Sequence, residues 1–338
     1  MTTLAIGVIG CGYWGPNLIR NFALNEKVKV KYVCDISRDR MDLITRTYPT
    51  IKGIDDYHEV LQDKEIDAVA IATPVGSHFE IGHQALLHGK HVLMEKPMAS
   101  SSKEADQLVN LAQSKGLVLM VDHVFVYTGA VRKIKELVRA GEIGDLLYYD
   151  GVRINLGQFQ RDVNVIWDLA PHDFSIMGFV LDRFPKSVHA LGSSHVKAGM
   201  ENTAYVTCRF SGSLMAHFHF NWLSPVKIRR TLIGGTKKMI IYDDLDPVEK
   251  VKVYDRGVDL SPDPQEIHKT LISYRTGDVW APVIDMTEGL KRVCDDFLDS
   301  ILMKKAPLSD GIAGYRVVRM LEAAQESLIS GDFVDIPE

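Results

Sequence analysis

The stretch Ile6-Gly-Val-Ile-Gly-Cys-Gly-Tyr-Trp-Gly15 decides the fold that this sequence predicts. It continues an apolar run that starts at Leu4, and Gly10, Gly12 and Gly15 have the G-x-G-x-x-G spacing. This pattern is typical of a buried strand that turns tightly into a helix. The first glycine permits the turn, the second lets a pyrophosphate approach the backbone, and the third lets helix and strand pack closely. The free N–H groups and the positive dipole end of the helix would face the phosphates.

The residues after the glycines strengthen this interpretation. A second strand is predicted at Val28–Cys34, and it ends at Asp35, twenty residues after Gly15. A carboxylate at this place accepts hydrogen bonds from the adenosine ribose and repels a 2′-phosphate, which favours NAD over NADP. Arg38 and Arg40 could soften that preference, or they could be surface cations on a helix that starts after Ser37.

Length, composition and charge limit the class of protein. A chain of 338 residues is long enough for two domains, and 46% hydrophobic with 25% charged residues is ordinary for a soluble globular protein. The net charge of −5 gives no electrostatic reason to expect nucleic acid or a membrane surface as a partner. The sequence predicts no membrane span and no secretion signal. Four scattered cysteines without a C-x-x-C pair indicate reduced thiols and a cytoplasmic location.

The first third of the chain alternates short apolar strands with helices. Strands are predicted at Ile66–Thr73, Val92–Met94 and Leu117–Val121, and capping boxes at Ser77 and Ser101 open two helices. This alternation predicts a doubly wound parallel sheet, an α/β Rossmann domain over residues 1–122. Ligands of such sheets bind beyond the carboxyl ends of the strands. We therefore expect cofactor contacts from Gly10, Gly12, Tyr13, Trp14, Gly15, Asp35, Thr73, Pro74, His78, Glu95, Lys96 and Pro97.

After Gly144 the pattern changes to period-two strands, and the domain boundary is expected near His123. Seven are predicted, at Leu146–Asn155, Ser187–Gly192, Thr203–Phe210, Leu214–Trp222, Arg229–Ile233, Met239–Tyr242 and Val251–Tyr254, with helices at Ala130–Ala140, Val165–Leu181, Thr287–Met303 and Gly314–Ser330. Residues 123–338 are thus expected to form an α+β domain with a large, mainly antiparallel, open-faced sheet. Because the helices can cover only part of that sheet, we expect its open face to form a homodimer or homotetramer.

Three side chains are candidates for proton transfer. Lys96 follows a strand at the cofactor rim, although a surface lysine is an equal alternative. Asp168 and His172 lie four residues apart, so on a helix they share a face, and a histidine exchanges protons readily near neutral pH. A buried helix-capping pair is the alternative interpretation. Pro171 inside this spacing indicates that the helix starts about there, which weakens the one-face argument.

The remaining histidines do not predict a metal site. Three are five residues apart and do not line one helical face, and two share a strand face without an evident third ligand: His78, His83, His88, His217 and His219. The nucleophile elbow of serine hydrolases and the P-loop of phosphoryl-transfer proteins are also missing from the sequence. We therefore expect no metal.

The sequence resembles the Gfo/Idh/MocA oxidoreductases, the family of glucose–fructose oxidoreductase and inositol dehydrogenase. The matching blocks are residues 9–15, Ala-Thr-Pro at 72–74, His-Val-Leu-Met-Glu-Lys-Pro at 91–97, Asp-Leu-Ala-Pro-His-Asp at 168–173 and Ser-Asp-Gly at 309–311. The resemblance implies that Lys96 is the conserved catalytic-site lysine, with Asp168 and His172 on the substrate side. It implies hydride transfer between a substrate carbinol carbon and nicotinamide, with His172 accepting the proton. Many relatives have glycine where this chain has Ala170 and Pro171.

The resemblance also implies a small substrate: a sugar, a cyclitol or a nucleotide-linked sugar. Asn155 and Arg161 could hold substrate hydroxyls or an anionic group, or lie on the surface. Lys227, Arg229 and Arg230 could offer charge to a diphosphate, or face solvent. The leading prediction is an NAD-dependent sugar or nucleotide-sugar dehydrogenase or ketoreductase. The alternatives are a cyclitol dehydrogenase, an enzyme that reduces a ring double bond, and a non-enzymatic dinucleotide-binding sensor.

Overall fold

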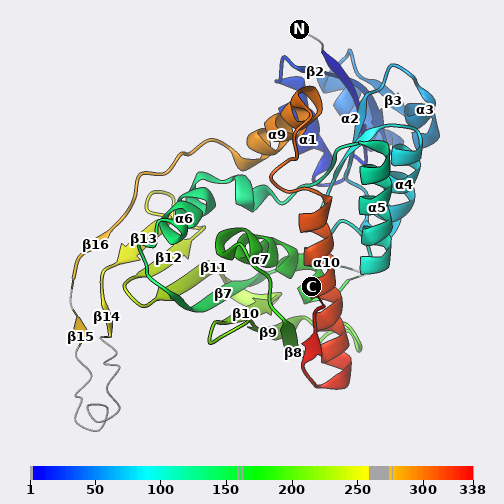
Figure 1. The fold of residues 1–338 in the computed structure, drawn as a ribbon. Helices are drawn as coiled ribbons and strands as arrows, with labels where there is room; N and C mark the ends of the chain where they lie inside the picture. The colour runs from blue at the N-terminus through cyan, green and yellow to red at the C-terminus, as the bar shows by residue number, and fades with distance from the viewer. Residues whose placement is uncertain (1–2, 158–159, 161–162, 259–273, 276, 338) are drawn as a thin grey trace. The chain divides into compact units, whose positions relative to one another are not determined.

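The computed structural model describes residues 3–157, 160, 163–258, 274–275 and 277–337. The chain divides into two compact units (Figure 1). The first consists of Met1–Tyr127 and Thr287–Glu322, and the second of Thr128–Met286 and Ala323–Glu338. Residues 287–322 therefore belong to the first unit, although they follow most of the second unit in the sequence. Among the described residues, no helix is long and apolar enough to cross a membrane.

Six parallel strands form the sheet of the first unit, in the order β3-β2-β1-β4-β5-β6. Their bounds are Leu4–Ile9 for β1, Val28–Cys34 for β2, Lys52–Ile54 for β3, Ala68–Ile71 for β4, His91–Met94 for β5 and Leu119–Val121 for β6. The chain order reverses between β1 and β4, which is the switch point where doubly wound sheets bind ligands. The predicted Rossmann sheet is confirmed.

Short helices connect these strands. They are α1 at Gly15–Ala23, α2 at Arg38–Thr47, α3 at Tyr57–Gln62, α4 at His78–Leu87 and α5 at Ser102–Lys115, with 3₁₀ turns η1 at Val75–Ser77 and η2 at Val124–Tyr127. Ser101 caps α5 as predicted, because its Oγ accepts a hydrogen bond of 3.2 Å from Glu104 N. The capping box at Ser77 does not form. Its hydroxyl instead hydrogen-bonds with the Thr73 hydroxyl and donates to Pro74 O, at 2.8 Å each, so it closes the preceding turn.

Two helices from the end of the chain complete the first unit. Helix α9 spans Gly289–Met303, and the first part of α10, which spans Gly311–Ser330, also belongs here. Phe297 of α9 is fully buried and contacts Phe22 of α1 edge to face, with ring centroids 6.5 Å apart. Burial of a phenylalanine contributes roughly 1.5–3 kcal/mol. Tertiary packing of this kind is not visible in a local sequence pattern.

A buried hydrogen-bond network holds the segment between these helices. The Tyr127 hydroxyl donates to Asp296 Oδ2 at 2.9 Å and accepts from Ser309 N at 3.1 Å. The Ser309 hydroxyl in turn donates to Val121 O at 2.6 Å. Burial and the neighbouring Asp296 carboxylate raise the pKa of Tyr127, so the phenol stays protonated and continues to donate.

The second unit contains a nine-stranded sheet in the order β16-β13-β12-β11-β7-β10-β9-β8-β17. The bounds are Leu146–Leu156 for β7, Ser187–Ser193 for β8, Thr203–Arg209 for β9, Met215–Asn221 for β10, Leu223–Gly235 for β11, Met239–Asp243 for β12, Val251–Tyr254 for β13, Val279–Trp280 for β16 and Val334–Asp335 for β17. Only β7 and β10 pair in parallel among these described strands. The expected mainly antiparallel sheet is confirmed. A separate pair joins β14 at Gly257–Val258 to β15 at Tyr274–Arg275.

Helices cover one face of this sheet, and among the described residues several side chains on the other face are exposed. Helix α7 at Val165–Leu181 packs on β7, β9 and β10, and α6 at Gly129–Arg139 packs against α7. Phe174 of α7 meets Phe218 and Phe220 edge to face on the covered side. On the opposite face Tyr205 stacks on His219, with ring centroids 4.4 Å apart, and 44% of Tyr205 is exposed.

Candidate active site

The glycine loop between β1 and α1 has a different geometry at each of its glycines. Gly10 has a φ of 101°, and a Cβ there would lie 2.5 Å from Ala72 O. A Cβ on Gly15 would lie 2.1 Å from Gly10 O. A Cβ on Gly12 would meet no atom closer than Arg40 Nη1, at 4.0 Å. The protein's own packing therefore requires glycine at positions 10 and 15 but leaves the backbone at Gly12 open to an approaching group.

The start of α1 is suited to an anion. Its N-terminal cap, Trp14, makes no side-chain capping bond, Pro16 occupies the first turn, and that turn contains no acidic residue. Tyr13 is 91% exposed beside Gly12, and its ring lies parallel to that of Trp14. A helix end of this kind presents unpaired N–H groups and a positive dipole to a phosphate. The loop therefore fits the pyrophosphate of a dinucleotide.

The carboxylate of Asp35, directly after β2, is oriented by hydrogen bonds from backbone N–H groups, one of them in the glycine loop. Its Oδ2 accepts from Cys11 N at 2.6 Å and its Oδ1 from Ser37 N at 2.8 Å. An ionised carboxylate has about four lone-pair positions, so it can still accept bonds from ribose hydroxyls. Arg40 of α2 lies over the same loop, as its distance from Gly12 shows. An acid and a cation thus both lie where the adenosine ribose is expected.

Two further loops follow β4 and β5 at the carboxyl edge of the sheet. His78 joins them, with Nε2 at 2.8 Å from Thr73 O and Nδ1 at 2.9 Å from Pro97 O. Burial lowers the pKa of His78, although bonds to two carbonyl oxygens favour the protonated ring. The Lys96–Pro97 peptide bond is cis. His78, 1% exposed, therefore acts at this edge by positioning Thr73-Pro74 against Glu95-Lys96-Pro97.

Acidic and imidazole groups gather around Lys96 at this edge. Glu95 accepts a hydrogen bond from Lys96 N, and its pKa is raised well above the usual range by burial and by Asp122, against the opposing charge of Lys96. Burial raises the pKa of Asp122 to about 6. Burial, with the charge of Lys96, lowers the pKa of His123 to about 3. The lysine therefore lies among groups whose charges depend on one another.

Asp122 also connects this cluster to the glycine loop. Its Oδ2 accepts a bond of 2.8 Å from Trp14 Nε1. Its Oδ1 and both ring nitrogens of His123 are buried and make no hydrogen bond to any residue that the structure describes. Sequence reasoning missed both residues. The available signal was their place directly after β6, which matches the place of Glu95 and Lys96 directly after β5.

In the second unit, α7 carries Asp168 and His172 one turn apart on one face. The helix begins at Val165, because Asn164 Oδ1 accepts bonds from Ile166 N at 3.1 Å and Trp167 N at 3.2 Å. The expectation that the helix starts about Pro171 is wrong. Pro171 lies inside it, where it can donate no N–H to the Trp167 carbonyl, and the capped first turn persists nevertheless.

Two contacts within the second unit orient this pair. Trp222 Nε1 donates to Asp168 Oδ2 at 3.1 Å. Asp173, directly after His172, forms a buried ion pair with Arg153 of β7, in which Nε donates to Oδ2 and Nη2 to Oδ1. Burial alone would lower the pKa of Arg153, but the Asp173 charge raises it. The Arg153–Asp173 ion pair, which the sequence did not predict, fixes α7 on the sheet at the residue beside His172.

The other expected substrate residues have separate places. Asn155 is half-buried near the end of β7. Arg161 lies outside the described residues. Arg229 pairs with Asp244 at 3.2 Å and Arg230 with Asp243 at 2.7 Å, so these two cations already have carboxylate partners. Among the described residues, no three His, Cys, Asp or Glu side chains cluster in a way that could hold a metal ion.

Comparison with known proteins identifies the family to which this chain belongs. Residues 4–123 match the model described as the oxidoreductase family with an NAD-binding Rossmann fold. Residues 131–241 match the Gfo/Idh/MocA C-terminal domain. The chain belongs to the Gfo/Idh/MocA oxidoreductase family. It is accordingly an NAD(P)-dependent oxidoreductase.

Relatives of this oxidoreductase act on sugars and cyclitols. The UDP-N-acetylglucosamine 3-dehydrogenase of Acidithiobacillus ferrooxidans is 27% identical over 328 residues, covering 94% of this chain and 95% of the relative. The scyllo-inositol 2-dehydrogenase (NADP(+)) of Bacillus subtilis is 25% identical over 354 residues, covering 96% and 94%. A solved structure of the Acidithiobacillus enzyme superposes with a TM-score of 0.81 at 24% identity, covering 97% and 98%. The last likeness supports the fold.

Proposed function

We propose that this oxidoreductase transfers a hydride between nicotinamide and a hydroxyl or keto carbon of a sugar or nucleotide-linked sugar. The observation that carries the proposal is the Asp168–His172 pair on α7, with Asp168 held by Trp222 Nε1 at 3.1 Å. A proton leaves or enters the substrate oxygen when the hydride moves, and an imidazole is suited to that exchange near neutral pH. The bound dinucleotide supplies the hydride acceptor or donor.

In this mechanism His172 takes the hydroxyl proton when the substrate is oxidised and returns it when the keto form is reduced. Asp168 orients the imidazole or binds a neighbouring hydroxyl. We propose that Lys96 assists by hydrogen bonding to the same substrate oxygen. The pKa values of Glu95, Asp122 and His123 around Lys96 are all shifted. This supports a role in proton transfer, because shifted pKa values cluster at catalytic sites.

Cofactor binding and substrate binding are assigned here to the two domains predicted from the sequence. We propose that residues 1–122 bind the dinucleotide and that residues 123–338 provide substrate binding and assembly, with 287–322 supporting the first unit. The cofactor contacts are proposed to come from the glycine loop, Asp35 and the loops at Thr73-Pro74 and Glu95-Lys96-Pro97.

We propose NAD as the preferred cofactor because Asp35 holds a negative charge beside the glycine loop. Arg40 supports some use of NADP, since it offers a cation near the same loop. Comparing kcat/KM for NAD and NADP tests this. A higher value for NADP would contradict the assignment to Asp35.

The substrate class is supported by the relatives. Likeness to UDP-N-acetylglucosamine 3-dehydrogenase over nearly the whole chain favours a nucleotide-linked sugar. A cyclitol is the second candidate, because the scyllo-inositol 2-dehydrogenase (NADP(+)) matches over a similar span. The pairing of Arg229 and Arg230 with aspartates gives no added support for a diphosphate site there. A panel of nucleotide-linked sugars, free sugars and inositols, followed by nicotinamide absorbance, decides between the classes.

Two substitutions test the residue roles. Lys96→Met and His172→Gln are each expected to lower kcat by about 10²–10⁴-fold, because each removes a proton-handling group. Affinity for NAD, measured by calorimetry, should change little. The exposed Lys103→Met and His88→Gln are matched controls and should keep full turnover. Near-normal kcat in either site variant would exclude that residue from proton transfer.

Assembly is proposed to use the open face of the second unit's sheet. Leu191, Tyr205 and Met215 are 67%, 44% and 50% exposed there, which is unusual for apolar side chains on one sheet face. A homodimer or homotetramer through this face would bury them. Sedimentation that shows a monomer at micromolar concentration would contradict this proposal.

A cytoplasmic location is supported by four buried free thiols.

A further inference from the structure

A cavity of about 560 Å³ lies in the first unit at the edge of the sheet opposite the glycine loop. His91 and Leu119, which line it, are the first residues of β5 and β6, whereas Lys96 and Asp122 follow the last residues of the same strands. Parallel sheets bind their main ligand beyond the carboxyl ends of the strands. The cavity at the amino ends is therefore outside the proposed cofactor and substrate site.

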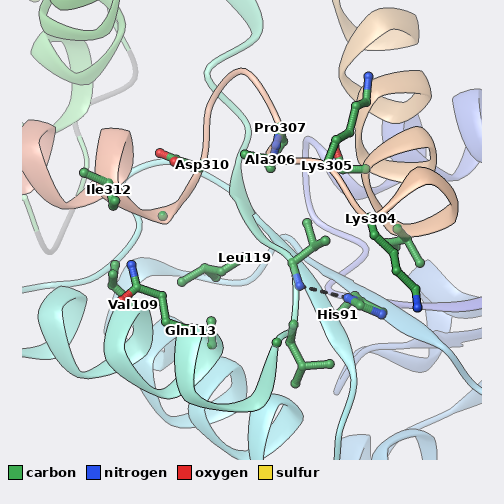
Figure 2. Close-up of a pocket in the computed structure, with 17 residues that line it drawn as sticks. His91, Val109, Gln113, Leu119, Lys304, Lys305, Ala306, Pro307, Asp310 and Ile312 are labelled. Atoms are coloured by element: carbon green, nitrogen blue, oxygen red, sulfur yellow. Dashed lines mark hydrogen bonds between the residues drawn. The ribbon is translucent and has the colours of Figure 1, made fainter.

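The walls of the cavity are largely apolar. Helix α5 forms one wall through Val109 and Ala112, and α9 and α10 contribute Ile301 and Ile312 to the other side. Figure 2 shows Leu119 between the α5 side chains and the loop that contains Ala306 and Pro307. A volume of this size lies within the range of roughly 300–1,000 Å³ that is usual for small-molecule sites. The lining suits the hydrocarbon or aromatic body of a ligand.

The charged groups around the cavity favour an anion. Lys304 lines it and forms no ion pair with any residue that the structure describes. Lys305 lies 3.3 Å from Asp296, so its charge is largely balanced. The one carboxylate of the lining, Asp310, accepts a bond of 2.9 Å from Ala313 N and so caps α10. Among the described residues, Lys304 is therefore the lysine of the lining that has no ion-pair partner.

Two further polar groups of the lining have spare hydrogen-bonding capacity. His91 Nδ1 accepts a bond of 2.9 Å from Val118 N, which places the proton of the neutral ring on Nε2 (Figure 2). Figure 2 shows His91 and Lys304 toward the same end of the cavity. Ser300 is fully buried, and its Oγ has no partner among the residues that the structure describes. A buried hydroxyl without a partner costs free energy.

We propose that this cavity binds a small organic anion, with its apolar body against α5 and its anionic group at Lys304 and His91. The site is independent of the proposed reaction, because none of its lining residues belongs to the glycine loop or follows the carboxyl end of a strand. The charged end would receive a charge-assisted hydrogen bond from Lys304 and a neutral one from His91 Nε2.

Anilinonaphthalene sulfonate, which combines an aromatic body with one anionic group, serves as the probe. Its fluorescence is titrated with the full chain in saturating NAD, which closes the cofactor site to the dye. We expect saturable binding under these conditions. Octanoate should displace the dye, whereas inorganic phosphate and octanol should not, because each lacks one half of the recognised chemistry. Complete loss of dye binding in NAD, or equal displacement by phosphate or octanol, would overturn the proposal.

Two variants locate the dye. Lys304→Asn removes the charge, and asparagine tolerates the left-handed backbone of position 304, where φ is 52°. Gln113→Trp fills the cavity from an exposed position on α5. Each should weaken octanoate binding about tenfold, from loss of a charge-assisted bond or from overpacking. Lys103→Asn, on the first turn of α5 and away from the cavity, is the matched control.

The folding of each variant is checked by its urea midpoint and its NAD affinity, both expected to match the unmodified chain. Unchanged octanoate affinity in both site variants would refute the site. Equal weakening in Lys103→Asn would show that the dye reports only general surface charge, and would refute it as well.

Discussion

Alanine substitution in the glycine loop separates what the fold requires from what a ligand requires. In Gly12→Ala the new Cβ would have Arg40 Nη1 as its nearest neighbour, at 4.0 Å, and Gly12 is not among the glycines with positive φ. Such a replacement usually stabilises by about 0.4–1 kcal/mol, through the entropy of the unfolded chain. We therefore expect the free energy of unfolding of Gly12→Ala to lie within about 1 kcal/mol of the parent value.

Gly10→Ala should behave differently. Its φ of 101° and the 2.5 Å approach to Ala72 O impose both backbone strain and overlap. Strain of this kind costs roughly 1–3 kcal/mol, and overpacking costs roughly 1–3 kcal/mol more. The expected loss in unfolding free energy is therefore about 2–6 kcal/mol. Urea unfolding followed by circular dichroism measures both variants under the same conditions.

The NAD affinity of Gly12→Ala tests whether position 12 needs glycine because a pyrophosphate approaches its backbone. If a pyrophosphate approaches this backbone, the added methyl group meets it, at an overpacking cost of about 1–3 kcal/mol. The dissociation constant measured by calorimetry should rise about 10–100-fold. Unchanged NAD affinity in Gly12→Ala would refute this account. A stability loss equal to that of Gly10→Ala would show instead that the protein itself needs glycine there.

Two further substitutions test the first unit. Because the folded pKa of Asp122 is raised from 3.8 to about 6, the ionised form is disfavoured in the fold, so stability should fall as pH rises through this window. Relative to Asp122→Asn, the parent should lose up to about 3 kcal/mol of unfolding free energy between pH 4 and 7, at about 1.4 kcal/mol per pKa unit. If urea unfolding gives the same pH dependence for both proteins, the pKa of Asp122 is not raised in the fold. Tyr127→Phe leaves Ser309 N without its acceptor and removes a donor to Asp296, so unfolding free energy should drop by about 1–3 kcal/mol. A change below about 0.5 kcal/mol would show that water replaces the phenol.

Much of the fold was predictable because its patterns are local. The bounds of β1, β2, β13 and α7 coincide with those expected from periodicity, since each is a continuous apolar or alternating run. The capping box at Ser77 failed because its hydroxyl bonds to Thr73 and Pro74, and a sequence pattern does not rank competing acceptors. The placement of residues 287–322 in the first unit depends on contacts such as Phe297 with Phe22, far apart in the sequence.

The positions of the candidate site residues were predictable where the residue type and the strand position coincide. The glycines, Asp35 and Glu95-Lys96-Pro97 follow strand ends, and the structure places them at one edge of the first sheet. Asp122 and His123 follow the same rule, but an aspartate and a histidine before a short turn carry no motif of their own. The Arg153–Asp173 pair was not predictable, because its partners come from a strand and a helix whose pairing only tertiary packing defines.

Strand β7 has a consequence for how the second unit acquires its structure. Its neighbours are β10, where Tyr148 pairs with Met215, and β11, where Tyr148 pairs with Gly234. The middle of the sheet therefore stays open until a long stretch of later chain has emerged and folded back. Contacts this distant along the polypeptide slow folding, since loop closure must precede any gain from pairing. During synthesis both edges of this strand would stay unpaired until β10 and β11 are made, which leaves it open to non-native pairing.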